Sequence, residues 1–270
     1  MATGIEKALL ERLLGDVRAR RPLVHHITNY VTVNDCANAT LCIGASPVMA
    51  HSVDEVADMA AMAGALVLNI GTLDAGQVES MLLAGKTANR LGIPIVLDPV
   101  GAGATAFRTR TALRLLEQLD IAVLKGNGGE ISVLAGAGGK VRGVDSAGVG
   151  GEPVEVVRAL AGRLGITVAM TGAVDIVSDG KRTLLVENGH PLMGRFSGSG
   201  CIAASIVGAF VAVGQDRVVS TAAALAAFGI AGERAAAHHK EPYGFRLAIF
   251  DELCRLTPKA LAGGARIRKG

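Results

Sequence analysis

The chain contains no tryptophan, and aromatic residues make up only 3% of its 270 residues. Proteins that hold single-stranded nucleic acid stack the bases on aromatic side chains, so this scarcity argues against a binding surface of that kind. The formal net charge is only +3, and the basic residues are scattered rather than clustered. We therefore expect no nucleic-acid partner.

Cysteine is scarce and the apolar runs are short. None of the four cysteines stands in a CxxC pair or in the spacing of a zinc site; they are Cys36, Cys42, Cys201 and Cys254. Residues 1–21 mix acidic side chains with arginines, which predicts an amphipathic helix and not a signal peptide. The longest apolar run, around residues 201–213, is too short to span a bilayer. These features predict a reduced, cytoplasmic protein with no membrane partner.

Half of the residues are apolar, which is enough to bury one large core, and 270 residues is an ordinary length for one α/β domain. We therefore predict a single domain over residues 1–270. Glycine is abundant, because the chain has 36 glycines where the usual share is about 7%. Many of them directly follow strand-like runs, where loops approach ligands.

Apolar runs of strand length alternate with helical segments. Strands are predicted at residues 65–70, 93–97, 121–124 and 166–170, and a helix from Asp74, with Gln77 as its capping-box partner, to Leu91. Two more strands, 175–178 and 183–186, flank the hairpin signal Asp179-Gly180, and the last third predicts alanine-rich helix. Four strand–loop–helix units in a row predict an α/β fold with a mostly parallel central sheet and helices on both faces. Ligands bind such sheets beyond the carboxyl ends of the strands.

Polar residues follow the predicted strands at that edge. Asp98 precedes a proline and either starts a turn or lies near a metal ion and phosphates. Glu130 stands three residues after Asn127, so it caps a helix or holds Mg²⁺, and the two roles are compatible. Lys125 suits a nucleotide phosphate as a point charge, although an isolated lysine is more often solvated. Thr171 either contacts nucleotide or simply ends a strand.

The segment Phe196-Ser-Gly-Ser-Gly-Cys201 leads directly into an apolar helical stretch. Gly198 and Gly200 leave backbone N–H groups bare at a helix N-terminus, where unpaired donors and the helix dipole favour an anion such as a transferring phosphoryl group. The plainer alternative is a loop that ends in a capped helix. Cys201, on the first turn, is either a small buried hydrophobe or an active-site thiol whose pKa the helix terminus lowers.

Two further patterns carry less weight. Residues 101–106 and 198–203 fit the loose GxGxxA dinucleotide pattern. A dinucleotide-binding motif would directly follow the first strand, and an acidic residue would end the next strand. Neither segment meets both conditions. A dehydrogenase is therefore disfavoured. The adjacent His25 and His26 would face opposite sides of a strand and could not share a metal ion. We interpret them, together with His238 and His239, as structural or solvated.

Several blocks of the sequence together resemble hydroxyethylthiazole kinase, a ribokinase-like enzyme of thiamine salvage. In chain order they are residues 25–38 (HHITNYVTVNDCAN), 46–50 (SPVMA), 68–73 (LNIGTL), 96–105 (VLDPVGAGAT) and 198–201 (GSGC). The resemblance covers nearly the whole chain. It implies a ribokinase-like fold and phosphorylation of 4-methyl-5-(2-hydroxyethyl)thiazole by ATP and Mg²⁺. It also implies a homotrimer with sites near the subunit boundaries.

The resemblance also implies roles for single residues. The implied sets are Asn29, Met49 and Gly198 for the thiazole, Lys125 and Thr171 for ATP, Asp98 and Glu130 for magnesium, and Gly198, Gly200 and Cys201 for catalysis. Related sugar kinases have an aspartate, their catalytic base, at the position of Cys201. Thiazole kinases resemble this sequence in having cysteine there. Because phosphoryl-transfer transition states are loose, a strong base is not essential.

The chain departs from the family pattern in three places. Lys125 stands where arginine is more common, which loses a planar fork but keeps the charge. Arg195-Phe-Ser197 and Glu241-Pro-Tyr-Gly-Phe245 also replace more usual residues. Two alternatives stay open: another ribokinase-like kinase, acting on hydroxymethylpyrimidine or pyridoxal, and a catalytically silent protein that binds thiazole or nucleotide.

Overall fold

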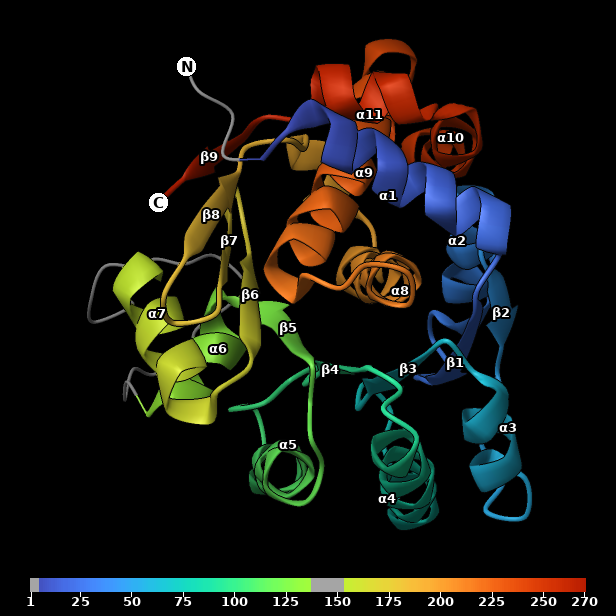
Figure 1. Cartoon of the computed structure of the whole chain (residues 1–270), viewed down its shortest axis with the longest axis vertical. Coiled ribbons are helices and arrows are strands. Elements are labelled where there is room, and N and C mark those ends of the chain that lie inside the picture. Colours follow the sequence, from blue (N-terminus) through green and yellow to red (C-terminus); the bar gives the residue numbers. More distant parts are fainter. Residues whose placement is uncertain (1–4, 137–152) are drawn as a thin grey trace.

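The computed structural model describes residues 5–136 and 153–270. A nine-stranded sheet runs through it in the order β2-β1-β3-β4-β5-β6-β7-β8-β9 (Figure 1). The first six strands in this order are parallel, and β7, β8 and β9 each join antiparallel. The strands are β1 (Leu23–Ile27), β2 (Ser46–Val48), β3 (Ala65–Asn69), β4 (Ile95–Asp98), β5 (Val123–Asn127), β6 (Thr167–Thr171), β7 (Asp175–Ser178), β8 (Thr183–Val186) and β9 (Ile267–Lys269). The predicted mostly parallel sheet is confirmed.

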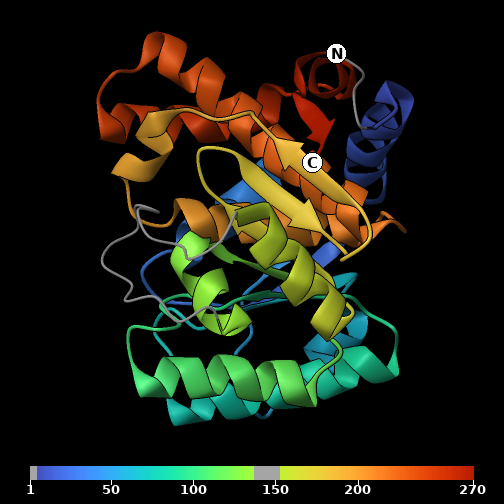
Figure 2. The same cartoon turned by 90° about the vertical axis from the view of Figure 1, so that its left-hand side faces the viewer.

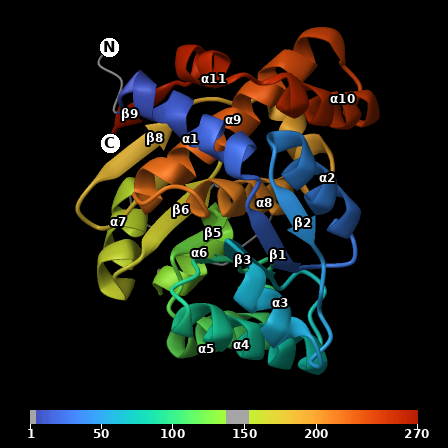
Figure 3. The same cartoon turned by 45° about the vertical axis from the view of Figure 1, so that its right-hand side comes forward.

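Helices cover both faces of the sheet, as predicted. α8 and α9 pack directly on one face, with α1, α10 and α11 outside them (Figure 1). On the other side lie α3 to α7, where α4 and α5 run side by side (Figures 2 and 3). The helices are α1 (Lys7–Arg20), α2 (Val33–Ile43), α3 (Val56–Met62), α4 (Ala75–Arg90), α5 (Ala106–Gln118), α6 (Gly128–Ala135), α7 (Pro153–Leu164), α8 (Ser199–Val211), α9 (Arg217–His238), α10 (Pro242–Arg255) and α11 (Pro258–Gly264), with a 3₁₀ turn at Pro191–Arg195.

Strand β3 shows how the sequence produces this layering. All of its residues are buried, and successive side chains point to opposite faces. Val67 belongs to the core formed with α8 and α9, whereas Leu66 and Leu68 belong to the core formed with α4 and α5. A strand that is buried on both faces therefore carries a continuous apolar run instead of an alternating pattern.

The structure corrects the predicted elements at several points. β6 is followed by the antiparallel strand β7 and not by a helix, so the fourth predicted strand–loop–helix unit is wrong. β1, β2 and β9 are absent from the predicted strands, and β9 interrupts the predicted helical last third. The predicted hairpin is confirmed, because β7 and β8 have the predicted bounds and pair antiparallel, with residues 179–182 connecting Ser178 to Thr183.

The predicted helix termini are only partly confirmed. Asp74 caps α4 by accepting the Gln77 N–H, as predicted, but the Gln77 side chain donates to the Thr28 carbonyl and does not complete a capping box. The predicted N-terminal helix is present as α1 from Lys7 onward. Residues 1–4 of that prediction lie outside the described residues.

Within the described residues, one helix, α9, is long and apolar enough to cross a membrane. However, 89% of its most apolar stretch is buried inside the protein, against α8, α10 and the sheet. A helix that is apolar on every side is what a buried position requires. Its composition is therefore explained by its place in the core.

Candidate active site

The carboxyl ends of the six parallel strands lie at one edge of the sheet, and the predicted polar residues gather there. Along this edge, in strand order, lie Met49 after β2, Asn29 after β1, Asn69 at the end of β3, Asp98 at the end of β4, Lys125 in β5 and Thr171 at the end of β6. The predicted substrate residues are thus at one end of the row. The predicted nucleotide residues are at the other end.

The N-terminus of α8 lies over the middle of this row, because α8 packs against β1, β3, β4 and β5. Gly198 precedes the helix with a φ of 98° and without a side-chain capping bond. A Cβ at this position would lie 2.4 Å from Cγ2 of Thr32, so the site requires glycine. Among the described residues, no protein acceptor binds the N–H groups of residues 199–201. These donors are free to bind an anion.

The Cys201 thiol contacts two side-chain amides. Its Sγ accepts hydrogen bonds from Nδ2 of Asn29 at 3.3 Å and from Nδ2 of Asn69 at 3.2 Å. Asn69 Nδ2 also donates to Asp98 Oδ2 at 2.8 Å. Burial and the Asp98 charge raise the pKa of Cys201, so the predicted lowering by the helix terminus is wrong. Because an ordinary thiol pKa is already about 8.5, Cys201 is a neutral thiol at pH 7.

Lys125 and Asp98 form a buried ion pair. Their side chains are 2% and 1% exposed, and Nζ lies 3.3 Å from Oδ1. Nζ also donates to the Gly200 carbonyl at 3.0 Å, so the ammonium contacts the first turn of α8 and the solvated alternative is wrong. Burial disfavours the Lys125 charge, but Asp98, Glu130 and Cys201 outweigh it and raise the pKa of Lys125. Burial raises the pKa of Asp98, although Lys125 opposes this effect.

Glu130 joins two loops at the same edge. Its Oε2 accepts the Asn127 N–H at 2.8 Å and Asn127 Oδ1 accepts the Glu130 N–H at 2.9 Å, which confirms the predicted helix cap. Oε1 accepts the Gly101 N–H, in the loop after β4, at 2.8 Å. Burial and the charge of Asp98 raise the pKa of Glu130. The two carboxylates are therefore close enough to repel each other.

This pair of carboxylates fits a divalent cation. Mg²⁺ needs only one or two protein carboxylates when phosphates and water complete its shell, and a cation would relieve the repulsion between Asp98 and Glu130. Each Glu130 oxygen accepts one N–H and keeps a second lone pair. Within residues 5–136 and 153–270, no group of three or more His, Cys, Asp or Glu side chains is placed to hold a metal ion.

The nucleotide end of the row contains Thr171 and a residue absent from the predicted set, Asp175. Thr171 Oγ1 donates to the Gly126 carbonyl of β5 at 3.3 Å. The Gly172 N–H donates to Asp175 Oδ1 at 3.0 Å. Burial raises the pKa of Asp175 to about 7, against the opposing effects of the Gly172 bond and the Lys125 charge. This places a titratable carboxyl beside the predicted ATP position.

The predicted substrate end of the row is fixed by short polar contacts. The N–H and the hydroxyl of Thr32 both donate to Asn29 Oδ1, at 3.0 and 3.1 Å, and so orient its amide. Met49 is half-buried directly after β2. His25, which is buried, lies with Nε2 2.7 Å from the Ala50 carbonyl next to Met49. His25 is therefore not solvated, and among the described residues its other ring nitrogen, Nδ1, is buried without a hydrogen-bond partner.

Three residues of this site are absent from the predicted set. Asn69 pairs in register with Asp98; the rule that polar residues at strand ends meet already places it at this edge from the sequence, although the predicted set gives it no role. Asp175 lies at the start of an antiparallel strand, where that rule does not apply. Thr32 acts through Asn29 and through its contact with Gly198, and no local pattern marks it.

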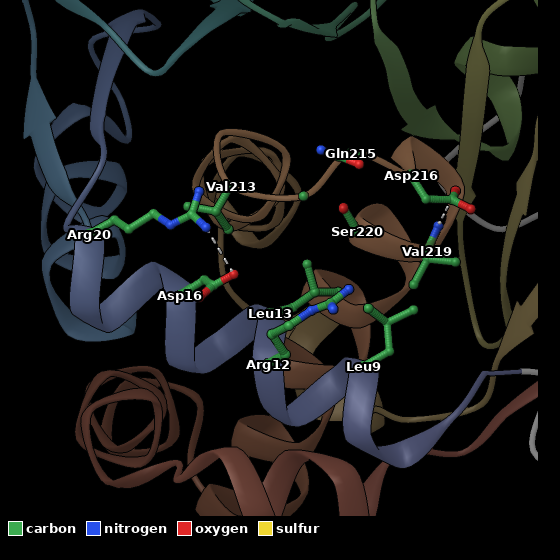
Figure 4. A pocket seen from close by; sticks show the side chains of 11 residues that line it. Leu9, Arg12, Leu13, Asp16, Arg20, Val213, Gln215, Asp216, Val219 and Ser220 are labelled. Carbon is green, nitrogen blue, oxygen red and sulfur yellow. Dashed lines mark hydrogen bonds and ion pairs between the residues drawn. The ribbon is translucent and has the colours of Figure 1, made fainter.

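Two cavities of the described residues lie away from this edge. One, of about 410 Å³, is lined by α1 and the α8–α9 connection, with Arg12, Asp16, Val213 and Ser220 among its residues (Figure 4). It lies beyond the C-terminus of α8, and at 1.5 Å per residue the 13 residues of this helix separate it from Cys201 by about 20 Å. The other is lined by the β7–β8 hairpin and the start of α9. Neither cavity contains a predicted site residue.

A mostly parallel α/β sheet with an open helix N-terminus over a row of polar side chains is typical of proteins that bind an anionic group at the carboxyl ends of the strands. Two solved structures show the same fold. A ribokinase-like superfamily protein from Enterococcus faecalis has a TM-score of 0.65 at 12% identity and covers 95% of this chain and 96% of its own. An ADP complex of Bacillus subtilis pyridoxal kinase has a TM-score of 0.55 at 19% identity, covering 76% and 88%. The fold is ribokinase-like.

Residues 14–259 match the hydroxyethylthiazole kinase family. Hydroxyethylthiazole kinases of Methanocella arvoryzae and Methanoculleus marisnigri are each 64% identical over 259 and 265 residues, covering 96% and 98% of this chain and 97% and 95% of theirs. The structure of a hydroxyethylthiazole kinase from Pyrococcus horikoshii has a TM-score of 0.89 at 47% identity and covers 97% of this chain and 99% of its own. The chain belongs to the hydroxyethylthiazole kinase family.

Proposed function

We propose that this protein phosphorylates the primary hydroxyl of 4-methyl-5-(2-hydroxyethyl)thiazole with ATP, a step of thiamine salvage. The observation that supports this most directly is the open N-terminus of α8. It lies between Asn29 and Met49 at one end of the strand edge and Lys125 and Thr171 at the other. A phosphoryl group that passes from nucleotide to acceptor needs hydrogen-bond donors at this midpoint.

In the proposed reaction, the thiazole hydroxyl oxygen attacks the γ-phosphorus of ATP in line. The bond from that phosphorus to the ADP oxygen breaks, and the hydroxyl proton passes to solvent. The N–H groups of residues 199–201 and the Lys125 ammonium stabilise the charge on the transferring group. Asn29, Met49 and Gly198 hold the acceptor, while Lys125 and Thr171 hold the nucleotide. Catalysis then depends on positioning and electrostatics.

In this mechanism Cys201 shapes the site and is not the base. Its thiol is neutral at pH 7 because burial and Asp98 raise its pKa, and its sulfur accepts two amide N–H groups. These contacts hold the first turn of α8 against the ends of β1 and β3. A loose transition state needs little proton abstraction before the phosphoryl group moves.

We further propose that Asp98 and Glu130 hold Mg²⁺ together with the phosphates of ATP. The ion would supply positive charge to the phosphate oxygens. The repulsion between the two carboxylates supports this assignment. Lys125 holds Asp98 in place through their ion pair and opposes the rise in its pKa, and the two backbone N–H groups bound by Glu130 keep that side chain in place.

The first experiment is to measure ADP release from ATP and Mg²⁺ with hydroxyethylthiazole, hydroxymethylpyrimidine or pyridoxal as acceptor. We expect turnover that depends on the thiazole. Turnover with another alcohol alone would retain the phosphoryl chemistry but reject the substrate. No turnover with any of the three would favour a protein that binds its ligand without reaction.

We also propose that residues 1–270 form one cytoplasmic kinase domain that assembles as a homotrimer with its sites near subunit boundaries. One sheet contains strands from Leu23 to Lys269, which supports a single domain. Family membership supports the trimer, and exposed apolar side chains lie beside the substrate end of the site: Tyr30 is 59% and Val31 is 67% exposed. Such residues are common at subunit interfaces.

A further inference from the structure

Arg108, in the first turn of α5, binds the two loops that follow β3 and β4. Its Nη1 donates to the Ile70 carbonyl at 3.0 Å and to the Val100 carbonyl at 2.8 Å. Its Nη2 donates to the Gly71 carbonyl at 2.7 Å. A single guanidinium therefore holds the backbone of both loops at once.

These two loops begin at residues of the active site. Asn69 directly precedes Ile70, and Asp98 lies two residues before Val100. Asn69 donates to Asp98 at 2.8 Å and to the sulfur of Cys201 at 3.2 Å. The two loops thus leave the sheet directly beyond the paired residues Asn69 and Asp98, whose contact reaches the first turn of α8 through Cys201.

The surroundings of Arg108 hold its own position. The backbone N–H of Arg108 donates to the hydroxyl of Thr105, the N-cap of α5, at 3.3 Å. Gly101 has a φ of 76° and its missing Cβ would lie 3.0 Å from Cδ of Arg108, so the loop backbone approaches the side chain closely. A planar guanidinium can bind three carbonyl groups in this arrangement, whereas the ammonium of lysine is a compact point charge on a flexible stem.

We propose that Arg108 is a positioning residue for phosphoryl transfer. It acts on the reaction by fixing the Asn69–Asp98 contact from the side of α5, and it touches neither nucleotide nor acceptor. This inference rests on the proposed function. A displacement of about 1 Å at a reacting centre costs about 10²-fold in rate, which sets the size of the expected effect.

The test compares Arg108→Ala and Arg108→Lys with Arg110→Ala, a control at an exposed arginine on the same helix. We expect kcat to fall about 10²-fold in Arg108→Ala with little change in KM for ATP or thiazole, because the transition state alone loses its geometry. Methylguanidinium added to Arg108→Ala should restore part of kcat. Arg110→Ala should behave as the wild type.

A double-mutant cycle with Asn69→Ala separates positioning from general destabilisation. If Arg108 acts through Asn69, Arg108→Lys should reduce kcat by a much smaller factor in the Asn69→Ala variant than in the wild type. Fully additive losses would overturn the proposal. The proposal would also be overturned if Arg108→Lys kept the wild-type kcat. It would be overturned as well if the loss of kcat only matched the unfolded fraction measured by circular dichroism.

Hydrogen exchange followed by mass spectrometry gives a readout that does not depend on turnover. Arg108→Lys should speed amide exchange in residues 70–73 and 100–104 and leave β3 and β4 unchanged. If these loops exchanged at the same rate in Arg108→Lys as in the wild type, the proposal would be overturned. If the wild-type protein failed to phosphorylate the thiazole, the proposed function would fail, and this exchange comparison would still decide whether Arg108 holds the loops.

Discussion

Gly198 is the residue at which backbone conformation and the anion site depend on each other most closely. Its φ of 98° is costly for any other residue by about 1–3 kcal/mol, and a Cβ would lie 2.4 Å from Cγ2 of Thr32. We therefore expect Gly198→Ala to displace the N–H groups of residues 199–201. Removing donors of this kind costs about 10²–10³-fold in kcat, and steady-state kinetics would measure it.

Thr32→Ser provides a matched partner for this change. It removes Cγ2 but retains the hydroxyl that donates to Asn29 Oδ1 at 3.1 Å. In the double variant Gly198→Ala with Thr32→Ser, part of the kcat and of the thermal stability should return, because the clash is gone while the backbone strain remains. Full additivity of the two single effects would show that the contact with Thr32 is not what constrains Gly198.

Cys201→Ala tests whether the thiol is a base. General bases contribute about 10²–10⁴-fold, so we expect a loss smaller than about 10²-fold and smaller than that of Gly198→Ala. The pH profile of kcat should keep its shape, because a thiol whose pKa is raised carries no charge in the neutral range. An alanine variant that folds and binds ATP but shows no turnover would make the thiol obligatory.

At the scale of elements, the sequence predicts the central strands well because their signals are local. Four strands, β3, β4, β5 and β6, are apolar runs that end in polar or glycine-rich loops. Most of their first and last residues lie within two positions of the predicted ones. β2 and β9 have three residues each and lie at the sheet edges. β2 contains Pro47, which edge strands tolerate, so neither segment carries a recognisable pattern.

The site residues divide in the same way. The cap formed by Asn127 and Glu130 joins residues three positions apart and is visible in the sequence. The contacts of Cys201 with Asn29 and Asn69 span 172 and 132 positions, so only the folded sheet brings them together. The raised pKa of Cys201 follows from that burial, and a rule based on the helix terminus alone could not predict it.

The turn between β6 and β7 makes stability depend on pH through Asp175. Its pKa is about 7 when folded and 3.8 ordinarily, so the folded state binds the proton more tightly. Proton binding at Asp175 therefore adds to the free energy of unfolding. This contribution is complete below about pH 4 and is lost as the pH rises to 7. Asp175→Asn keeps an oxygen for the Gly172 N–H and should be more stable than the wild type at pH 8, by roughly a few kcal/mol.

Urea unfolding between pH 5 and pH 8 would measure this difference. The advantage of Asp175→Asn should grow up to pH 7 and then level off. Asp120→Asn, at an exposed aspartate, controls for the change in net charge. A difference that does not vary with pH would show that Asp175 titrates as an ordinary carboxyl in the folded protein.

At the scale of the whole molecule, the nine-stranded sheet places the proposed substrate end of the site beside its β2 edge. Asn29 and Met49 lie there, and the Tyr30 ring packs edge-on against His51 with centroids 6.4 Å apart. The nucleotide end lies toward β6, where three antiparallel strands extend the sheet. An assembly that covers the β2 side would therefore enclose the acceptor and leave the nucleotide end accessible.

Val31→Asp tests this arrangement, since Val31 is 67% exposed next to the acceptor residues. The wild type should sediment at three times the 27.5 kDa chain mass, and an unpaired carboxylate buried in the interface should cost roughly 3 kcal/mol or more, which shifts the trimer to monomers at micromolar concentration. Leu91→Asp, at a residue 55% exposed after α4, should leave the trimer intact. A monomeric wild type, or a Val31→Asp protein that stays trimeric with an unchanged KM for the thiazole, would place the interface elsewhere.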